Sequence, residues 1–286
     1  MNVNSLPVNS LPSEHNDGGV SIIRYRSAKP VPRVMITLSR NMITFLLTGE
    51  KTVHFAGTEV NVKPHQFVML AAGNCLMSEK IAAPGTEYHS ILILFDNTHI
   101  SNFFDRHTML IERPVKTVDQ LPFLLFEKDE FLINFTRSLD CLLVGDKPVH
   151  PQLQKVKLEE LLVYLSVRYP RQIEQIGNMH YEADDELLIR QAVTSHITSN
   201  ITIEELAFLC NMSLSTFKRR FARLYNNSPN RWLLEKRMEK AAEMLRSNDY
   251  KASEIFSELG YENLSSFIQA FKQIHGVTPK QYQLSI

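Results

Sequence analysis

The stretch that decides the fold is Leu206–Pro229, LAFLCNMSLSTFKRRFARLYNNSP. A short apolar segment is followed by a turn at Asn211-Met212. Ser213 then stands where a second helix begins, and its hydroxyl can accept a hydrogen bond from a free amide of that helix. Apolar residues recur at spacings of three and four, which is typical of one face of an α-helix: Leu214, Phe217, Phe221 and Leu224. The pattern predicts a helix-turn-helix.

The second helix of this motif is strongly basic. An amphipathic basic helix is by itself more often a solvated surface helix than a DNA reader. The formal net charge of the 286-residue chain is zero, so global basicity gives no support to nucleic-acid binding. Local charge does, because residues 214–240 hold eight Lys or Arg and two Glu. This stretch is the predicted phosphate-binding surface.

The pattern occurs twice. Ile255–Tyr261 follows Leu206–Met212 at an offset of 49 residues, and Phe267 and Phe271 follow Phe217 and Phe221 at an offset of 50, so the second turn is one residue longer. A long apolar-faced helix from Pro229 to Ser247 lies between the copies. Two recognition helices held about 34 Å apart can enter successive major-groove faces of one DNA duplex.

With these residues in place, the segment from Asp184 to Ile286 resembles the DNA-binding domain of AraC/XylS-type transcriptional regulators. Its motif is carried by Leu206-Ala207, Ser213, Phe217, Phe221, Pro229, Arg237, Ala241, Leu245, Ile255, Gly260-Tyr261, Ser265, Phe267, Phe271-Lys272, Gly276, Thr278-Pro279 and Tyr282. Phe256 departs from the family's usual Ala, so the second unit must repack there. Asn226 replaces the usual Gly and tolerates the same left-handed backbone.

The resemblance implies a sequence-specific DNA-binding transcriptional regulator, an activator, whose partners are double-stranded promoter DNA and RNA polymerase. An effector, either a small molecule or a protein, would control it through the N-terminal domain. The residues of the effector site cannot be chosen from one sequence.

The inward-facing phenylalanines of each second helix leave other positions free to meet DNA. The predicted base-reading residues are Ser215, Thr216, Lys218, Arg219, Leu264, Ser266 and Gln269. Arg219 is the strongest candidate, because its fork can bridge two acceptors of guanine, and Gln269 can pair with adenine in the same bidentate way. The predicted phosphate contacts are Arg220, Arg223, Arg231 and Lys272.

The rest of the chain predicts an α+β protein in four parts. Residues 1–19 are a predicted disordered tail, and 20–176 a sensor and dimerisation domain. A linker at 177–183 and an all-α DNA-binding domain at 184–286, with two helix-turn-helix units joined by a long helix, complete the chain. Short strands separated by turn signals are expected at Val34–Leu38, Asn41–Leu47, Thr52–Phe55, Thr58–Val62, Gln66–Leu70 and His89–Phe95, with turns including Gly73-Asn74. They indicate a small β-barrel or jelly roll, similar to the cupin-type sensor half of AraC-type regulators.

Residues 97–177 have a helical pattern, with helices expected at Ile100–Phe104, Phe131–Leu143 and Pro151–Tyr169. The apolar face of the last helix, with Leu161, Leu162 and Leu165, either packs on the barrel or forms a homodimer. Its segment Lys157–Leu162 resembles the ExsA-like branch of the family, whose sensor domain dimerises and takes a protein ligand. Residues 171–182 are polar and aperiodic, which places the linker there.

No enzyme, cofactor or metal is expected. The three cysteines fit neither a disulfide framework nor a metal motif and are expected to be buried thiols in the cytoplasm. No apolar run reaches membrane-spanning length. His54, His65 and His89 lie on or near strands without the spacing of a cupin metal site. The alternative is a cupin-fold enzyme or small-molecule binding protein with a degenerate DNA-binding domain.

Overall fold

A computed structural model describes residues 19–81, 86–107, 122–144, 148–176, 185–247 and 250–285. The chain divides into two compact units. Unit 1 comprises Met1–His54 and Glu59–Glu182, and unit 2 comprises Phe55–Thr58 and Ala183–Ile286. The predicted tail, apart from Gly19, and the predicted linker lie outside the described residues. No helix in the described ranges is long and apolar enough to cross a bilayer.

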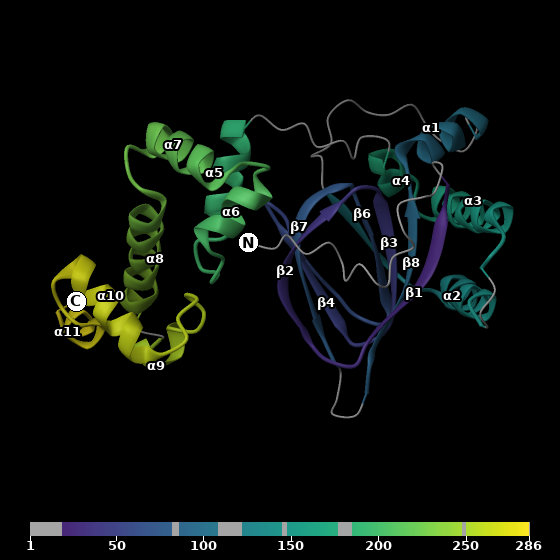
Figure 1. The fold of residues 1–286 in the computed structure, drawn as a ribbon. Helices are drawn as coiled ribbons and strands as arrows, with labels where there is room; N and C mark the ends of the chain where they lie inside the picture. The colour runs from purple at the N-terminus through teal and green to yellow at the C-terminus, as the bar shows by residue number, and fades with distance from the viewer. Residues whose placement is uncertain are drawn as a thin grey trace. The chain divides into compact units, whose positions relative to one another are not determined.

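Unit 1 is built on two antiparallel sheets that face each other (Figure 1). The five-stranded sheet has the order β1-β8-β3-β6-β9 and the four-stranded sheet the order β2-β7-β4-β5. The strands are β1 (Ser21–Ser27), β2 (Val31–Leu38), β3 (Asn41–Thr48), β4 (Glu50–His54), β5 (Glu59–Val62), β6 (Gln66–Leu70), β7 (Gly73–Lys80), β8 (Tyr88–Phe95) and β9 (Phe123–Glu127). The predicted small β-barrel or jelly roll is confirmed, and β4 and β5 pair as an antiparallel hairpin.

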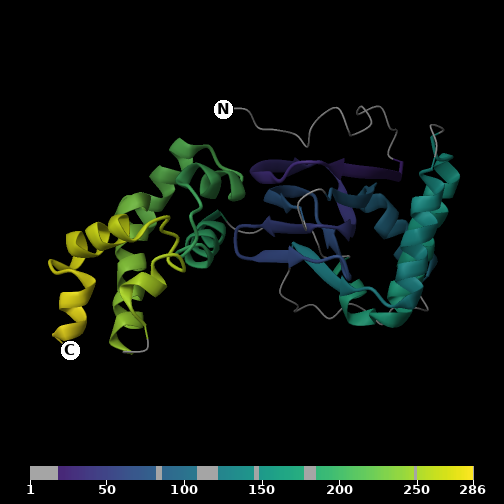
Figure 2. The same cartoon turned by 90° about the horizontal axis from the view of Figure 1, so that it is seen from below.

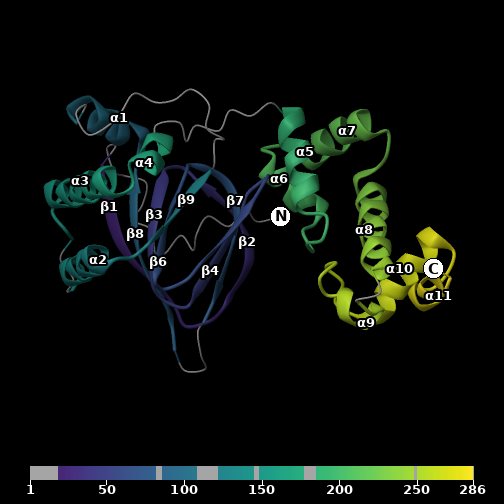
Figure 3. The same ribbon diagram turned by 180° about the vertical axis from the view of Figure 1, so that it is seen from behind.

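Three strands differ from the sequence prediction. β7 begins at Gly73, where a turn was expected, and pairs with both β2 and β4. β1 pairs with β8, and β9 lies in the stretch expected to be helical and closes the edge of the sheet beside β6 (Figure 3). β7 was not predicted because its sequence, GNCLMSEK, has no run of β-branched residues. β9 was not predicted because it is stabilised by pairing with a strand more than fifty residues earlier in the sequence.

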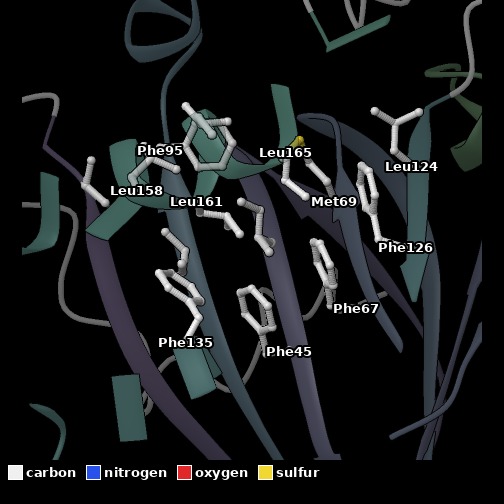
Figure 4. Packing of buried hydrophobic residues seen from close by; sticks show 14 of the residues in the cluster. Phe45, Phe67, Met69, Phe95, Leu124, Phe126, Phe135, Leu158, Leu161 and Leu165 are labelled. Carbon is white, nitrogen blue, oxygen red and sulfur yellow. The ribbon is translucent and has the colours of Figure 1, made fainter. Parts of the chain in front are cut away.

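Four helices cover one face of the five-stranded sheet (Figure 2). They are α1 (Asn97–Arg106), α2 (Glu130–Leu142), α3 (Pro151–Arg168) and α4 (Pro170–Ile176). Phe45, Phe67 and Phe126 form a stacked aromatic row on the sheet, and Leu161 and Leu165 of α3 pack against the same cluster (Figure 4). Leu161, Leu162 and Leu165 are therefore buried within the chain. Of the two alternatives for this apolar face, packing on the barrel is the one that the structure shows.

Two expectations for unit 1 are wrong. Residues 171–176 are not part of a linker but belong to α4, and Ile173 is buried in the helix–sheet core. Cys141 is exposed on α2, whereas Cys75 and Cys210 are buried as expected. The sequence around Cys141 is apolar, but its position on the helix is on the side away from Leu139 and the sheet.

Unit 2 is all-α. Its helices are α5 (Asp185–Ser195), α6 (Ile203–Leu209), α7 (Leu214–Tyr225), α8 (Pro229–Arg246), α9 (Ala252–Ile255), α10 (Leu264–His275) and α11 (Pro279–Leu284). The predicted architecture of two helix-turn-helix units joined by a long helix is confirmed, with α8 as that helix (Figure 1).

Candidate nucleic-acid interface

The first helix-turn-helix consists of α6 and α7. Thr202 and Glu205 form a capping box that starts α6, and the Ser213 side chain accepts from the Thr216 amide at the start of α7, as predicted. The turn places Asn211 at φ 56°, and α7 ends at Asn226 with φ 48°. Both asparagines adopt the left-handed backbone that Asn tolerates better than other side chains except Gly.

The second helix-turn-helix, formed by α9 and α10, has glycines at the positions of these two asparagines. Gly260 (φ 77°) lies in the turn after α9, and Gly276 (φ 76°) ends α10. The α9 helix is a single turn that ends at Ile255, and Phe256, the residue that departs from the family pattern, lies half-buried against the core of this unit. That core includes Ile255, Leu259, Phe267 and Phe271.

The loop 196–199, between α5 and α6, contacts both α8 and the turn of the second helix-turn-helix. Arg237 of α8 is half-buried and donates to the carbonyl oxygens of Ile197 (2.7 Å) and Ser199 (3.0 Å). Burial lowers the pKa of its guanidinium, which lies 5.9 Å from the ring centroid of Tyr261. A Cβ on Gly260 would lie 2.8 Å from the Thr198 carbonyl oxygen, so the second turn also abuts this loop. Arg237 is therefore a structural cation, although it belongs to the basic stretch 214–240.

The exposed face of α7 carries the strongest predicted readers. Phe217 and Phe221 are fully buried. Arg219 is two residues from each, which on a 100° per residue wheel places it opposite the buried side, and Ser215 lies one turn before it on the same face. Ser215, Lys218 and Arg219 are exposed and Thr216 is half-buried. In the described part of the chain, no carboxylate lies within salt-bridge distance of Lys218 or Arg219.

The second recognition helix, α10, presents a neutral face. Phe267 and Phe271 are fully buried, and Gln269 occupies the position of Arg219, fifty residues further on. Ser266, Gln269 and Lys272 are exposed, whereas Leu264 is half-buried against the unit's core. Ser265 was not among the predicted base-reading residues, although it is exposed and corresponds to Ser215 at the same offset.

The predicted phosphate-binding arginines have acidic neighbours. Arg220 pairs with Asp185, and Arg223 with Glu186 at 3.2 Å. Arg231 pairs with Glu235 of its own helix at 2.9 Å. The first two pairs join residues more than thirty positions apart, so no local sequence pattern predicts them. Lys272, by contrast, is exposed with no acidic partner within the described ranges.

A β-sandwich carrying a double helix-turn-helix with a cationic first reading face defines a two-domain DNA-binding protein. A family model described as the ExsA N-terminal regulatory domain matches residues 41–173, and one described as a helix-turn-helix domain matches residues 206–285. Within the described residues, no group of three His, Cys, Asp or Glu could hold a metal ion.

Curated relatives span both units. The HTH-type transcriptional regulator ExsA of Pseudomonas aeruginosa is 25% identical over 82% of this chain and 83% of its own length. The thermoregulatory protein LcrF of Yersinia pestis is 22% identical over 93% of this chain and 97% of its own length. A solved structure of ToxT from Vibrio cholerae aligns over 94% of this chain and 99% of that chain, with 12% identity and a TM-score of 0.37.

The chain thus carries an N-terminal regulatory domain of the ExsA type and a C-terminal helix-turn-helix domain of the AraC type, and its relatives are AraC-family transcriptional regulators. Its function is that of a sequence-specific DNA-binding transcriptional regulator controlled through the N-terminal domain.

Proposed function

We propose that the two recognition helices read one promoter site with different chemistry. Arg219, at the centre of the exposed face of α7, would bridge two acceptors of a guanine, and Gln269 at the matching position of α10 would pair with an adenine. Ser215, Thr216, Lys218, Leu264 and Ser266 would line the two grooves around these residues. The observation that carries the proposal is the shared position of Arg219 and Gln269, each opposite two buried phenylalanines.

The phosphate contacts in this proposal come from Arg220, Arg223, Arg231 and Lys272. Three of these residues must exchange a carboxylate for a phosphate when DNA binds. The exchange is inexpensive, because exposed ion pairs contribute only about 0–1 kcal/mol. The first helix-turn-helix thus supplies most of the electrostatic attraction to DNA, and the second helix-turn-helix contributes mainly to sequence specificity.

We also propose that two copies associate through α3. Leu153, Val156 and Val167 of this helix are 38%, 49% and 69% exposed. A groove of about 520 Å³ runs along it, lined by Phe131, Val156, Glu159, Glu160, Val163, Tyr164 and Val167. A second copy is the occupant we favour, because homodimers with twofold symmetry are the commonest soluble oligomers and two copies would place paired readers on adjacent sites.

In this account the protein works in the cytoplasm as an activator that contacts RNA polymerase. It would act without catalysis, metal or cofactor. An effector, either a small molecule or a protein, would shift the arrangement or association of the N-terminal domains and so change how firmly two copies hold DNA.

Selection of genomic fragments with the purified full-length protein tests the proposal. The expected result is an enriched motif with two conserved blocks about one DNA turn apart, one containing guanine and one adenine. Absence of any enrichment at low salt, with and without cell extract as a source of effector, would contradict it.

A further inference from the structure

A second feature of unit 1 lies apart from the α3 groove. A hollow of about 270 Å³ opens between the C-terminal end of β3, the loop before β6 and the helix α2. It is lined by Leu46, Leu47, Pro64, His65, Lys128, Ile133, Thr136, Arg137 and Asp140. The volume is below the range of drug-sized ligand sites, which is about 300–1,000 Å³, so the hollow suits a compact molecule.

Lys128 is fixed within this hollow. Its backbone amide donates to the His65 carbonyl at 2.8 Å, and its ammonium donates to the carbonyl oxygens of Leu46 (2.5 Å) and Pro64 (2.8 Å). An ammonium has three donors, so one remains for a ligand. Burial lowers the pKa of Lys128 to about 8, and no carboxylate offsets this effect. The lysine is therefore a half-buried cation without a counter-ion in the described part of the chain.

The carboxylates near Lys128 are already engaged. Asp140 pairs with Arg24, and Glu127 accepts from Gln66 at 2.7 Å and faces His65 at 3.7 Å. Arg137 has only a long hydrogen bond to Asn134 (3.4 Å) among the described contacts. Lys128 and Arg137 thus give the hollow an excess of positive charge.

We propose that this hollow binds a compact organic anion, whose carboxylate or phosphate group is held by Lys128 and Arg137. Leu47, Ile133 and the ring of Pro64 would contact the apolar part of the molecule. Arg137 can hold an oxyanion with two parallel N–H bonds, and Lys128 adds a point charge with a preset position. The role of this ligand as the effector rests on the proposed action of an effector on the N-terminal domain, whereas its binding does not.

Isothermal titration calorimetry of the full-length protein, without DNA, tests whether the hollow binds an anion. Sodium butyrate and inorganic phosphate are the two probes, each titrated at ionic strength held constant with sodium chloride. The expected result is saturable binding of one anion per chain, weakened about tenfold or more by Arg137→Gln and by Lys128→Met. Lys29→Met, which removes an exposed lysine elsewhere in unit 1, should leave the affinity unchanged.

The two probes distinguish the sources of the oxyanion. Tighter binding of butyrate identifies an organic acid, and tighter binding of phosphate a phosphorylated compound; both support the site. Because Lys128 also bonds two carbonyls, Lys128→Met could disturb folding, and Arg137→Gln at the exposed rim then decides. No binding of either anion below about 10 mM, or binding unaffected by Arg137→Gln, would overturn the inference. A protein that binds anion but selects no DNA would refute the proposed promoter reading and leave this site standing.

Discussion

At the residue scale, the arginines of α7 divide by their partners. Arg220 and Arg223 face Asp185 and Glu186 at the start of α5, where the carboxylates also complement the helix dipole. Arg219 lies one turn before Arg223 on the exposed face of α7 and has no acidic neighbour in the described residues. Adjacent arginines of one helix therefore differ in role, one able to read bases and the others able to exchange a carboxylate for phosphate.

This division predicts a gain of DNA affinity when an acidic neighbour is neutralised. Asp185→Asn frees Arg220 and removes a negative charge near the phosphates, so DNA should bind about two- to fivefold more tightly. Fluorescence anisotropy at low salt measures the effect, and the difference should shrink as salt is raised. Glu243→Gln, an exposed carboxylate on α8 without an arginine partner among the described contacts, is the matched control. Equal affinities for wild type and Asp185→Asn would show that Arg220 does not contact DNA.

At the scale of elements, two glycines at the ends of helical segments differ in what surrounds them. Gly260 and Gly276 have the same left-handed φ, but only Gly260 has a backbone carbonyl 2.8 Å from the place of a Cβ. Gly276→Ala should therefore lower the free energy of unfolding by only about 1–2 kcal/mol, the strain of a Cβ in the left-handed conformation. Gly260→Ala adds a clash with the loop at Thr198 and should cost about 3 kcal/mol or more.

Urea denaturation followed by tryptophan fluorescence measures both glycine variants. Trp232 is the only tryptophan of the chain and packs beside Phe221 and Tyr225, so its emission reports on unit 2 alone. Similar losses of stability for the two variants would mean that the second turn does not rest on the 196–199 loop.

A buried ion pair joins β4 and β7. Lys51 and Glu79 are 1% and 3% exposed, and their charged atoms lie 3.3 Å apart. Lys51→Met should lower the unfolding free energy by about 3–5 kcal/mol, because it leaves a buried carboxylate without its partner. Lys51→Met with Glu79→Leu should recover much of that loss. Thermal unfolding followed by circular dichroism compares the variants, and a double variant as unstable as the single one would contradict this account.

Helices and strands set by local patterns could be predicted from the sequence, whereas those that depend on distant partners could not. Capping residues, left-handed asparagines and alternating apolar patterns are local, and they predicted the first helix-turn-helix and six strands. β1, β7 and β9 depend on pairing with β8, with β2 and β4, and with β6, which no local pattern contains. The ion pairs of Arg220 and Arg223, and the fixed position of Lys128, depend in the same way on distant residues. The sequence alone could therefore suggest which residues meet DNA, but not which of them already have a partner.

At the scale of the whole molecule, association through α3 makes a separate prediction. Val156→Glu places a charge in the α3 groove and should convert a dimer into a monomer in sedimentation velocity runs. Val144→Glu is the matched control, because Val144 is 74% exposed and does not line the groove. A wild-type protein that is monomeric at concentrations well above those of the DNA assays would contradict the proposed dimer.

Arg219 is proposed to read a base and not merely to attract the phosphate backbone of DNA. The most direct test measures binding to the selected site and to a variant site with the guanine replaced, for wild type and for Arg219→Lys. Lysine keeps the charge but loses the bidentate fork. We predict that Arg219→Lys loses about 1–3 kcal/mol of discrimination between the two sites, while the salt dependence of binding stays nearly unchanged. Undiminished discrimination, or a uniform loss at both sites with a reduced salt slope, would show that Arg219 holds phosphate and that the reading face of α7 lies elsewhere.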